Sequence, residues 1–235
     1  MIKEAVRPRP KVPLDKPHGR EALKAALGRQ PLTAAVDLGA SKVACFIMKP
    51  DGVRKDSRTL TTAGVGYVQS RGVRGGAIID VDQAAEAIAQ AVERAETVAQ
   101  ANVAGVTVCT TAGQLASHRV ATRVSLGARQ IADADLARAI SAALSGVRLP
   151  GRRAIHLRPI AWSVAGQRGV KDPRNMYGRS LGLELLIVSI SEPVFQTIGA
   201  CVERAHLQFE GVVAAPYASA LAALEEDEMD LGAVC

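Results

Sequence analysis

Apolar and polar positions alternate along three short runs that begin at residue 33. These runs are TAAVDL (33–38), KVACFIM (42–48) and LTTAGVGYV (60–68), and a Pro-Asp-Gly turn follows the second of them. Alternation with a period of two, bounded by turn-forming residues, is typical of strands. The pattern therefore predicts a meander of three strands.

The period changes at Asp80. Apolar residues recur at spacings of three and four from Val81 to Val98, which places them on one face of a helix of about five turns. Asp80 stands at the N-cap, and Gln83 occupies the position of its reciprocal partner in a capping box.

The remaining pattern predicts an interrupting unit followed by a return of the first pattern. The unit contains a strand at 106–111, an alternating region at 118–126, a helix at 134–144 closed by Gly146, and a strand-like run at 154–166 broken by Pro159. After a polar segment come a buried strand at 183–190, a helix capped by Ser191, a strand at 209–214 and a helix from Pro216. This order predicts an α/β fold, with helices packed on a mixed sheet.

Charge and proline are concentrated at the start of the chain. The protein has 235 residues, with 29 Lys and Arg against 23 Asp and Glu, and residues 1–30 carry eight of the basic and three of the acidic side chains. Four prolines and few large apolar groups predict a flexible basic arm over 1–30. Basic arms attract polyanions, but this one has no aromatic residue to stack on bases, so we expect no nucleic-acid partner.

Cysteine spacing and hydropathy bear on the compartment. The four cysteines, Cys45, Cys109, Cys201 and Cys235, are far apart and form no C-x-x-C pair, which favours a reducing cytoplasm. The sequence shows neither an apolar leader nor a membrane-spanning run. His118 and His156 have no ligand-type companions at metal-site spacing, and no nucleophile-elbow motif supports a hydrolase.

The most informative chemistry lies in AVDLGASKVACFIM (35–48). An acid at the end of the first strand, a glycine turn, a small residue, a hydroxyl and a cation could together receive a phosphate, and the candidate residues are Asp37, Gly39, Ala40, Ser41 and Lys42. Asp37 could hold Mg²⁺ through water. An ordinary type I′-like hairpin with a solvated Lys42 remains the alternative.

Several separated segments resemble one family in the correct order. VDLGASKVAC, SRGVRGGAIIDVD (70–82), TTAG (110–113) and GVKDPRNMYGRSLGLELLIVSIS (169–191) are similar to the bacterial cell-division family FtsA, of the actin/Hsp70-like superfamily. The resemblance covers about residues 33–235. It implies an actin-like subdomain 1A over 31–100 and 168–230, an inserted α+β subdomain called 1C over 101–167, and the start of a second actin-like half at 231–235.

The resemblance also implies a function. FtsA-type proteins bind ATP with Mg²⁺, polymerise at the cytoplasmic face of the inner membrane at the division site, tether the FtsZ ring and recruit later septal proteins through 1C. The FtsZ-binding part and the membrane-inserting terminal helix have no counterpart here, and we expect the chain to be a fragment.

Catalysis is expected to be weak. Hydrolysis in this superfamily uses a Gln or Glu at the turn after the fifth strand, where this chain has Ala214 and Ala215. We therefore expect no catalytic residue, at most slow ATP hydrolysis, and ATP as a conformational ligand. A pilus-assembly relative and a small-molecule kinase of the same superfamily remain alternatives.

Arginines are frequent in the predicted 1C-like unit. The eight are Arg119, Arg123, Arg129, Arg138, Arg148, Arg152, Arg153 and Arg158. As a cluster they are consistent with an acidic partner or a neighbouring subunit, whereas for any one of them a solvated basic face is the favoured interpretation.

Overall fold

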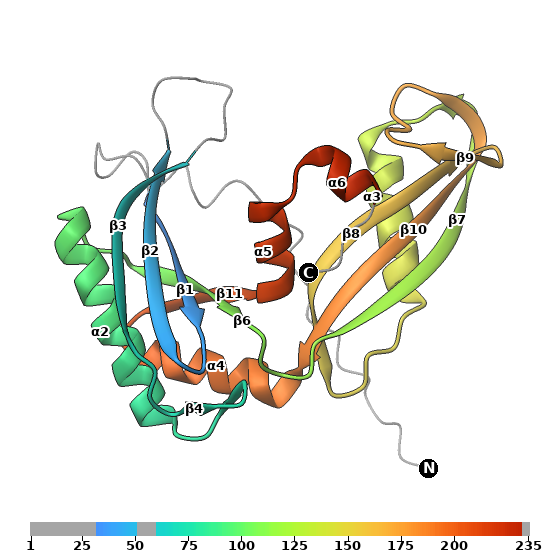
Figure 1. Cartoon of the computed structure of the whole chain (residues 1–235). Helices are drawn as coiled ribbons and strands as arrows, with labels where there is room; N and C mark the ends of the chain where they lie inside the picture. The colour runs from blue at the N-terminus through green and yellow to red at the C-terminus, as the bar shows by residue number, and fades with distance from the viewer. Residues whose placement is uncertain (1–31, 51–59, 232–235) are drawn as a thin grey trace, which may run out of the picture.

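Two sheets organise the residues that the computed structural model describes, 32–50 and 60–231. The strands are β1 (Thr33–Leu38), β2 (Lys42–Pro50), β3 (Leu60–Gln69), β4 (Val73–Arg74), β5 (Ala77–Ile78), β6 (Gly105–Thr110), β7 (Ala116–Gln130), β8 (Arg152–Val164), β9 (Gln167–Val170), β10 (Tyr177–Ser191) and β11 (Gln208–Ala214). The helices are α2 (Val81–Ala99), α3 (Asp133–Ser145), α4 (Glu192–Arg204), α5 (Ala215–Ala223) and α6 (Glu226–Leu231). In Figure 1 the two sheets stand side by side and join where β6 leads into β7 and β10 leads into α4.

The first sheet has five strands in the order β11-β6-β1-β2-β3. The predicted meander β1-β2-β3 is antiparallel, whereas β6 runs parallel to both β1 and β11. Because β1, β6 and β11 point the same way, their carboxyl ends meet at one edge of the sheet. We call this sheet with α2, α4 and α5 the main lobe.

Helices α2 and α4 cover one face of the five-stranded sheet and contact each other. Ile88 on α2 and Ile198 on α4 are fully buried there with Val36 and Val108 of the sheet. Helix α2 begins as predicted: the Asp80 carboxylate accepts the amides of Asp82 and Gln83, each at 3.0 Å, and the side chain of Gln83 donates back to it. The 3.6-residue pattern thus located the helix and its start.

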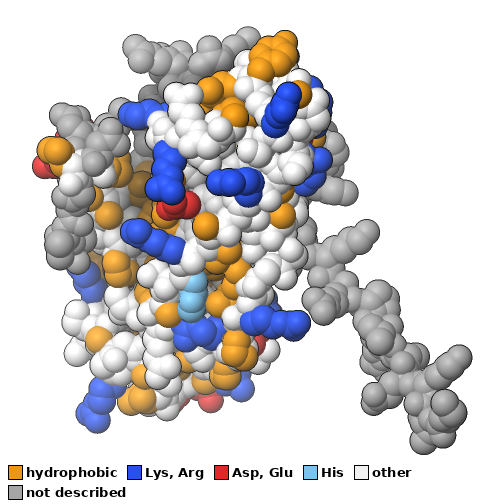
Figure 2. Space-filling view, turned by 90° about the vertical axis from the view of Figure 1, so that its right-hand side faces the viewer, with side chains coloured by type: hydrophobic (Ala, Val, Ile, Leu, Met, Phe, Trp, Pro, Cys, Tyr) orange, Lys and Arg blue, Asp and Glu red, His pale blue; other side chains and the backbone are white. Residues whose placement is uncertain are grey.

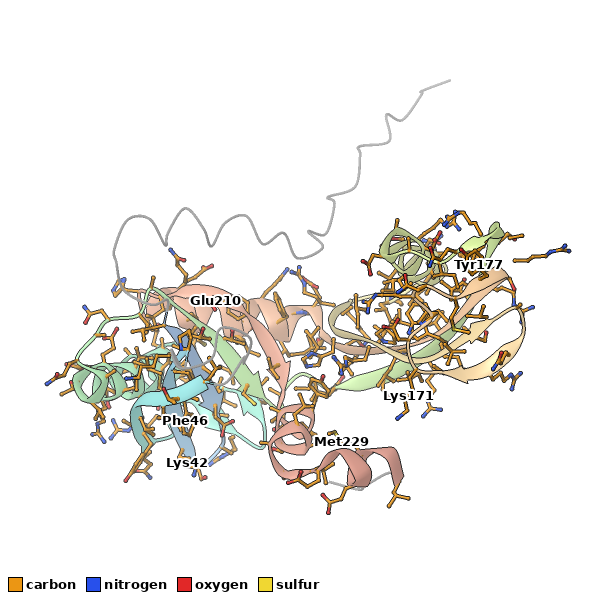
Figure 3. All side chains as sticks on the ribbon, turned by 90° about the horizontal axis from the view of Figure 1, so that it is seen from above. Lys42, Phe46, Lys171, Tyr177, Glu210 and Met229 are labelled. Carbon is orange, nitrogen blue, oxygen red and sulfur yellow. The ribbon has the colours of Figure 1, made fainter. Side chains whose placement is uncertain are left out.

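The opposite face of this sheet is less covered. Helix α5 lies over β11 and β6, and none of its residues is buried. Farther along the sheet, Phe46 on β2 and Tyr67 on β3 are 42% and 65% exposed. Lys42 and Phe46 project from this same face (Figure 3).

The second sheet has four strands in the order β7-β10-β8-β9, and α3 packs on one of its faces. Leu181, Leu183, Leu185 and Ile187 of β10 form the core of this layer, together with Trp162. We call this sheet with α3 the inserted lobe (residues 116–191). Trp162 is 8% exposed in this core, whereas Tyr177, at the start of β10, is 72% exposed.

The boundary that the sequence placed at residue 167 cuts through this sheet. Strand β10 contains the apolar run assigned to the main lobe, but it pairs with β7 from Ser189 to Tyr177 and with β8 from Ser191 to Leu181. A continuous apolar run shows that a strand is buried and does not show in which sheet. The inserted lobe therefore ends near residue 191. Its predicted start at residue 101 is also wrong, because β6 pairs with β1 and β11 in the first sheet.

Other local expectations also needed correction. Pro159 does not break β8, because the register skips Ile160 in a bulge next to it. Ser191 is the N-cap residue of α4, but its side chain makes no capping hydrogen bond. Gly146 closes α3 as predicted. The arm over 1–30 and residues 232–235 lie outside the described residues, and Leu231 belongs to α6 rather than to a strand.

Candidate functional site

The turn between β1 and β2 lies at the edge where the parallel strands end. The Gly39 amide donates to the Lys42 carbonyl at 3.1 Å, and the Ser70 amide donates to the Ser41 carbonyl at 3.0 Å. A Cβ on Gly39 would lie 2.9 Å from the Lys42 carbonyl oxygen, so the turn requires glycine at this position. None of residues 39–42 has a positive φ, which distinguishes the turn from the type I′ hairpin considered above.

The five predicted residues are therefore together. Ala40, Ser41 and Lys42 are exposed at the tip, and Asp37 is half-buried at the end of β1. Within 32–50 and 60–231, no hydrogen bond or ion pair engages the Asp37 carboxylate. It lies beside Cys109 of β6 in the parallel register, and burial, followed by the charge of Asp37, raises the pKa of that thiol.

A residue that the sequence did not single out adds to this turn. The Ser70 hydroxyl is buried and has no hydrogen-bond partner in the described part of the chain, although its own amide bonds to the turn. A buried hydroxyl without a partner costs free energy, so such a group marks a place where a ligand or water could bind. The sequence signal that could have identified Ser70 is the segment SRGVRGG, which begins at this residue.

Two further chain segments end at the same edge. After β6, the Thr110 hydroxyl accepts the Ala112 amide at 3.0 Å and forms a local turn. After β11, Ala214 and Ala215 form the junction with α5 where the sequence placed them, so this junction offers no carboxylate or amide side chain. The Ala214 amide donates instead to Nε2 of His156 at 3.0 Å, which ties β8 of the inserted lobe to the junction.

His156 is suited to accept this bond. Burial, followed by the charge of Arg158, lowers the pKa of its imidazole and favours the neutral form that can accept a hydrogen bond. Its ring also lies 4.7 Å from the ring of Tyr217 on α5. Arg153 adds an ion pair to Glu192 at 2.6 Å, so several contacts hold the two lobes together.

A hollow of about 480 Å³ lies between the β4–β5 hairpin, the segment after β6 and the start of α4. Gly75, Gly76, Thr111, Gly113 and Ser191 line it. Three of the four segments on which the family resemblance rests therefore meet at one place. Adding a Cβ to Gly113 would bring it into the side chain of Ile190, so this glycine permits close approach of the two lobes.

The described residues also bear on metal binding and on membrane insertion. No group of three or more His, Cys, Asp or Glu side chains is placed there to hold a metal ion. No helix in these residues combines the length and the apolar character needed to span a bilayer.

Comparison with known proteins supports the resemblance to FtsA. A family model described as the SHS2 domain inserted in FtsA matches residues 112–189. Cell division protein FtsA of Agrobacterium fabrum is 36% identical over 211 residues, covering 87% of this chain and 47% of that protein. Over 87% of its length, the chain is therefore similar to FtsA proteins. FtsA of Rhizobium meliloti is 33% identical over 210 residues, covering 87% and 48% of the two chains.

The FtsA match fits the corrected boundary, because residues 112–189 contain β10. The fold is also seen in the PilM-PilN type IV pilus biogenesis complex, with a TM-score of 0.51, 10% identity, and coverage of 82% of this chain and 50% of that chain. That likeness confirms the α/β architecture predicted from the sequence. The chain spans about half the length of the FtsA proteins it matches.

Proposed function

We propose that this chain supplies one wall of an ATP site in an FtsA-type cell-division protein. The supporting observation is that the β1–β2 turn, with an unpaired Asp37 and the buried hydroxyl of Ser70, lies where the parallel strands β1, β6 and β11 end. In α/β sheets, ligands bind outside the carboxyl ends of parallel strands.

The residues fit a triphosphate and its magnesium ion. The exposed Ser41 hydroxyl, the Lys42 ammonium and the turn amides would face phosphate oxygens, and Asp37 would hold Mg²⁺ through water. The bound nucleotide would supply charge and contacts that link this wall to a second one. Since relatives are about twice as long, we propose that the second wall lies in the part of FtsA-type proteins that this chain does not cover.

ATP then serves as a conformational ligand. The β11–α5 junction, with Ala214 and Ala215, offers no side chain that could orient a water for attack, so we propose slow hydrolysis at most. His156 connects the same junction to the inserted lobe, which gives the nucleotide site a direct contact with that lobe.

At the level of the whole protein, we propose the division role of the family. The complete protein would polymerise on the cytoplasmic face of the inner membrane at the division site and tether the FtsZ ring. Its inserted lobe would meet later septal proteins. The 33–36% identity with the two rhizobial FtsA proteins supports this role over that of a pilus-assembly protein or a small-molecule kinase.

Calorimetric titration with ATP and Mg²⁺ tests the nucleotide proposal. The chain alone should bind weakly, with a dissociation constant in the millimolar range, because a single wall makes few contacts. Asp37→Asn should remove the Mg²⁺ dependence of binding. The matched control Asp82→Asn alters an exposed acid on α2 that pairs with Arg204 and should leave it unchanged.

Two results would contradict this proposal. Micromolar affinity of the chain for ATP would refute the proposal that it forms only one wall of the site, because the contacts of a single wall are too few for that affinity. Equal Mg²⁺ dependence of ATP binding in the Asp37→Asn and Asp82→Asn variants would contradict the assignment of phosphate binding to the β1–β2 turn.

A further inference from the structure

Most of the arginines singled out in the sequence have structural partners. Arg129 and Arg138 pair with Asp135, Arg153 pairs with Glu192, Arg152 donates to Ser189, and Arg158 lies over the ring of Tyr217. Arg119, Arg123 and Arg148 have no partner among residues 32–50 and 60–231. The first two of these lie on one strand, β7.

Arg119 and Arg123 project from the face of the inserted sheet that α3 does not cover. Val120 and Val124 pack into the core on the α3 side, so the residues between them point away from it. Arg119, Ala121 and Arg123 are all exposed. Along a strand, positions four residues apart on one face are separated by about 13 Å.

A single acid stands between the two arginines. In the antiparallel register, Ala121 lies opposite Glu184 of β10, while Arg119 and Arg123 lie opposite Leu186 and Gly182. Glu184 is exposed and forms no ion pair with any described residue. Arg123, Glu184 and Arg168 line a hollow of about 410 Å³ with Ser163 and Gly182. Figure 2, which views the molecule from the side of the inserted lobe, shows basic side chains gathered around one acidic patch.

Strand β7 is also an edge strand. It is 15 residues long, and β10 is its only strand neighbour in the described sheet. Its register with β10 is regular from Ala116 to Ser125. The outer side of such a strand presents unpaired amides and carbonyls, which can pair with an added strand.

We propose that β7 binds an extended peptide as an additional strand, and that the peptide carries the pattern acid-x-base-x-acid on one face. Its two carboxylates lie opposite Arg119 and Arg123, where cross-strand pairs of opposite charge are stabilising. Its central Lys or Arg lies opposite Ala121, whose short side chain leaves Glu184 within reach. The pattern reads the same in both directions, so it fits a parallel or an antiparallel strand.

Glu184 and the edge backbone favour a peptide over other anions. A nucleic acid or an anionic membrane presents repeated negative charge, which the central carboxylate would repel. Neither of them offers amides to pair with the edge of β7. The proposal does not depend on nucleotide binding, because β7 residues 117–125 lie away from the β1–β2 turn.

Fluorescence anisotropy tests the proposal with a labelled peptide, Thr-Val-Glu-Val-Lys-Val-Glu-Val-Thr, and the whole chain. Arg119→Ser combined with Arg123→Ser should weaken binding about tenfold. The matched control, Arg148→Ser with Arg179→Ser, removes the same charge from positions outside β7 and should change the affinity less than twofold. The inverted peptide, with Lys at the Glu positions and Glu at the Lys position, should bind at least tenfold more weakly.

Backbone methylation separates strand addition from charge attraction. Two versions of the peptide carry N-methyl groups on alternate residues, one version on each edge of the extended chain. One version should bind like the parent peptide, and the other should not bind, because only one edge faces β7.

Four results would overturn the proposal. They are undetectable binding of the parent peptide, equal loss in the two double variants, equal behaviour of the two methylated peptides, and displacement of the peptide by a single-stranded oligonucleotide or by phosphatidylglycerol vesicles at equal charge. None of these four results affects the outcome of the ATP titration, so the failure of one proposal can be distinguished from the failure of the other.

Discussion

Close packing of α2 on β3 depends on two glycines, and Gly66 gives the sharper test. A Cβ at this position would lie 2.5 Å from the Ala95 amide nitrogen and 2.8 Å from Cβ of Arg94. Ordinary van der Waals contacts begin near 3.4 Å. The Gly66→Ala variant must therefore move the helix away from the strand by roughly 1 Å, because most of these contacts involve backbone.

The energetic cost follows from that displacement. A gap of 0.5–1 Å forfeits about a quarter to a half of each dispersion contact, and α2 buries Ile88, Ala91 and Ala95 in this core. We expect a net loss of about 2–3 kcal/mol in the free energy of unfolding. This corresponds to a shift of the urea midpoint by roughly 1 M.

Two probes can locate the effect. Far-ultraviolet circular dichroism follows the whole chain, while the single tryptophan, Trp162, lies in the core of the inserted lobe. The Gly66→Ala variant should shift the dichroism transition to lower urea more than the fluorescence transition. Gly127→Ala is the matched control, because Gly127 has no atom within 4 Å of its Cβ position and no positive φ. Equal stability of the two variants, within about 0.5 kcal/mol, would refute the packing argument.

Further predictions concern charge, protonation and thiol reactivity. Asp135→Ala removes the carboxylate that receives Arg129, Arg138 and the Ala132 amide, so it should lower the urea midpoint reported by Trp162 more than Asp82→Ala does; an equal effect would contradict it. The imidazole of His156 has a pKa below its unfolded value, so its stabilising effect is complete above about pH 6.5 and declines as the pH falls through the folded pKa. The stability difference between the wild type and His156→Gln should therefore shrink between pH 7 and pH 5, measured by urea unfolding, and a constant difference would be the opposing result. Burial raises the pKa of Cys45 to about 12 and that of Cys201 to about 11, so iodoacetamide at pH 8 should label neither in the native protein and both in urea, as read by peptide mass spectrometry.

The sequence predicted the elements with a clear period. The helix after Asp80 and the three-strand meander follow directly from the 3.6-residue and two-residue patterns, and Asp80 caps the helix as predicted. The reciprocal bond of a capping box is absent, because the Gln83 side chain donates to the Asp80 carboxylate and the Asp80 amide donates to the Gly72 carbonyl. The sequence predicted strand β10 but assigned it to the wrong sheet. In either sheet the run from Leu183 to Ile190 would pack against a helix on one face, so the run does not distinguish the two sheets.

The sequence predicted only part of the candidate site, because the rest depends on contacts between distant segments. The β1–β2 turn was identifiable from the local order of acid, glycine, hydroxyl and lysine. The unpaired Ser70 hydroxyl and the bond between His156 and the Ala214 amide depend on segments far apart in sequence, brought together by the junction of the lobes. Likewise, the arginine count could not separate Arg129, which pairs with Asp135, from Arg119, which has no partner in the described structure.

Residue-resolved nuclear magnetic resonance with Mg-ATP tests the central claim most directly. At millimolar Mg-ATP, amide shifts should change at residues 39–42, at Ser70, after β6 at Thr111 and Ala112, and at Ala214, where the strands end together. The β7 amides from Ser117 to Ser125 should stay unchanged. Shifts confined to the inserted lobe, or none at the β1–β2 turn, would contradict the assignment of a nucleotide site to this edge.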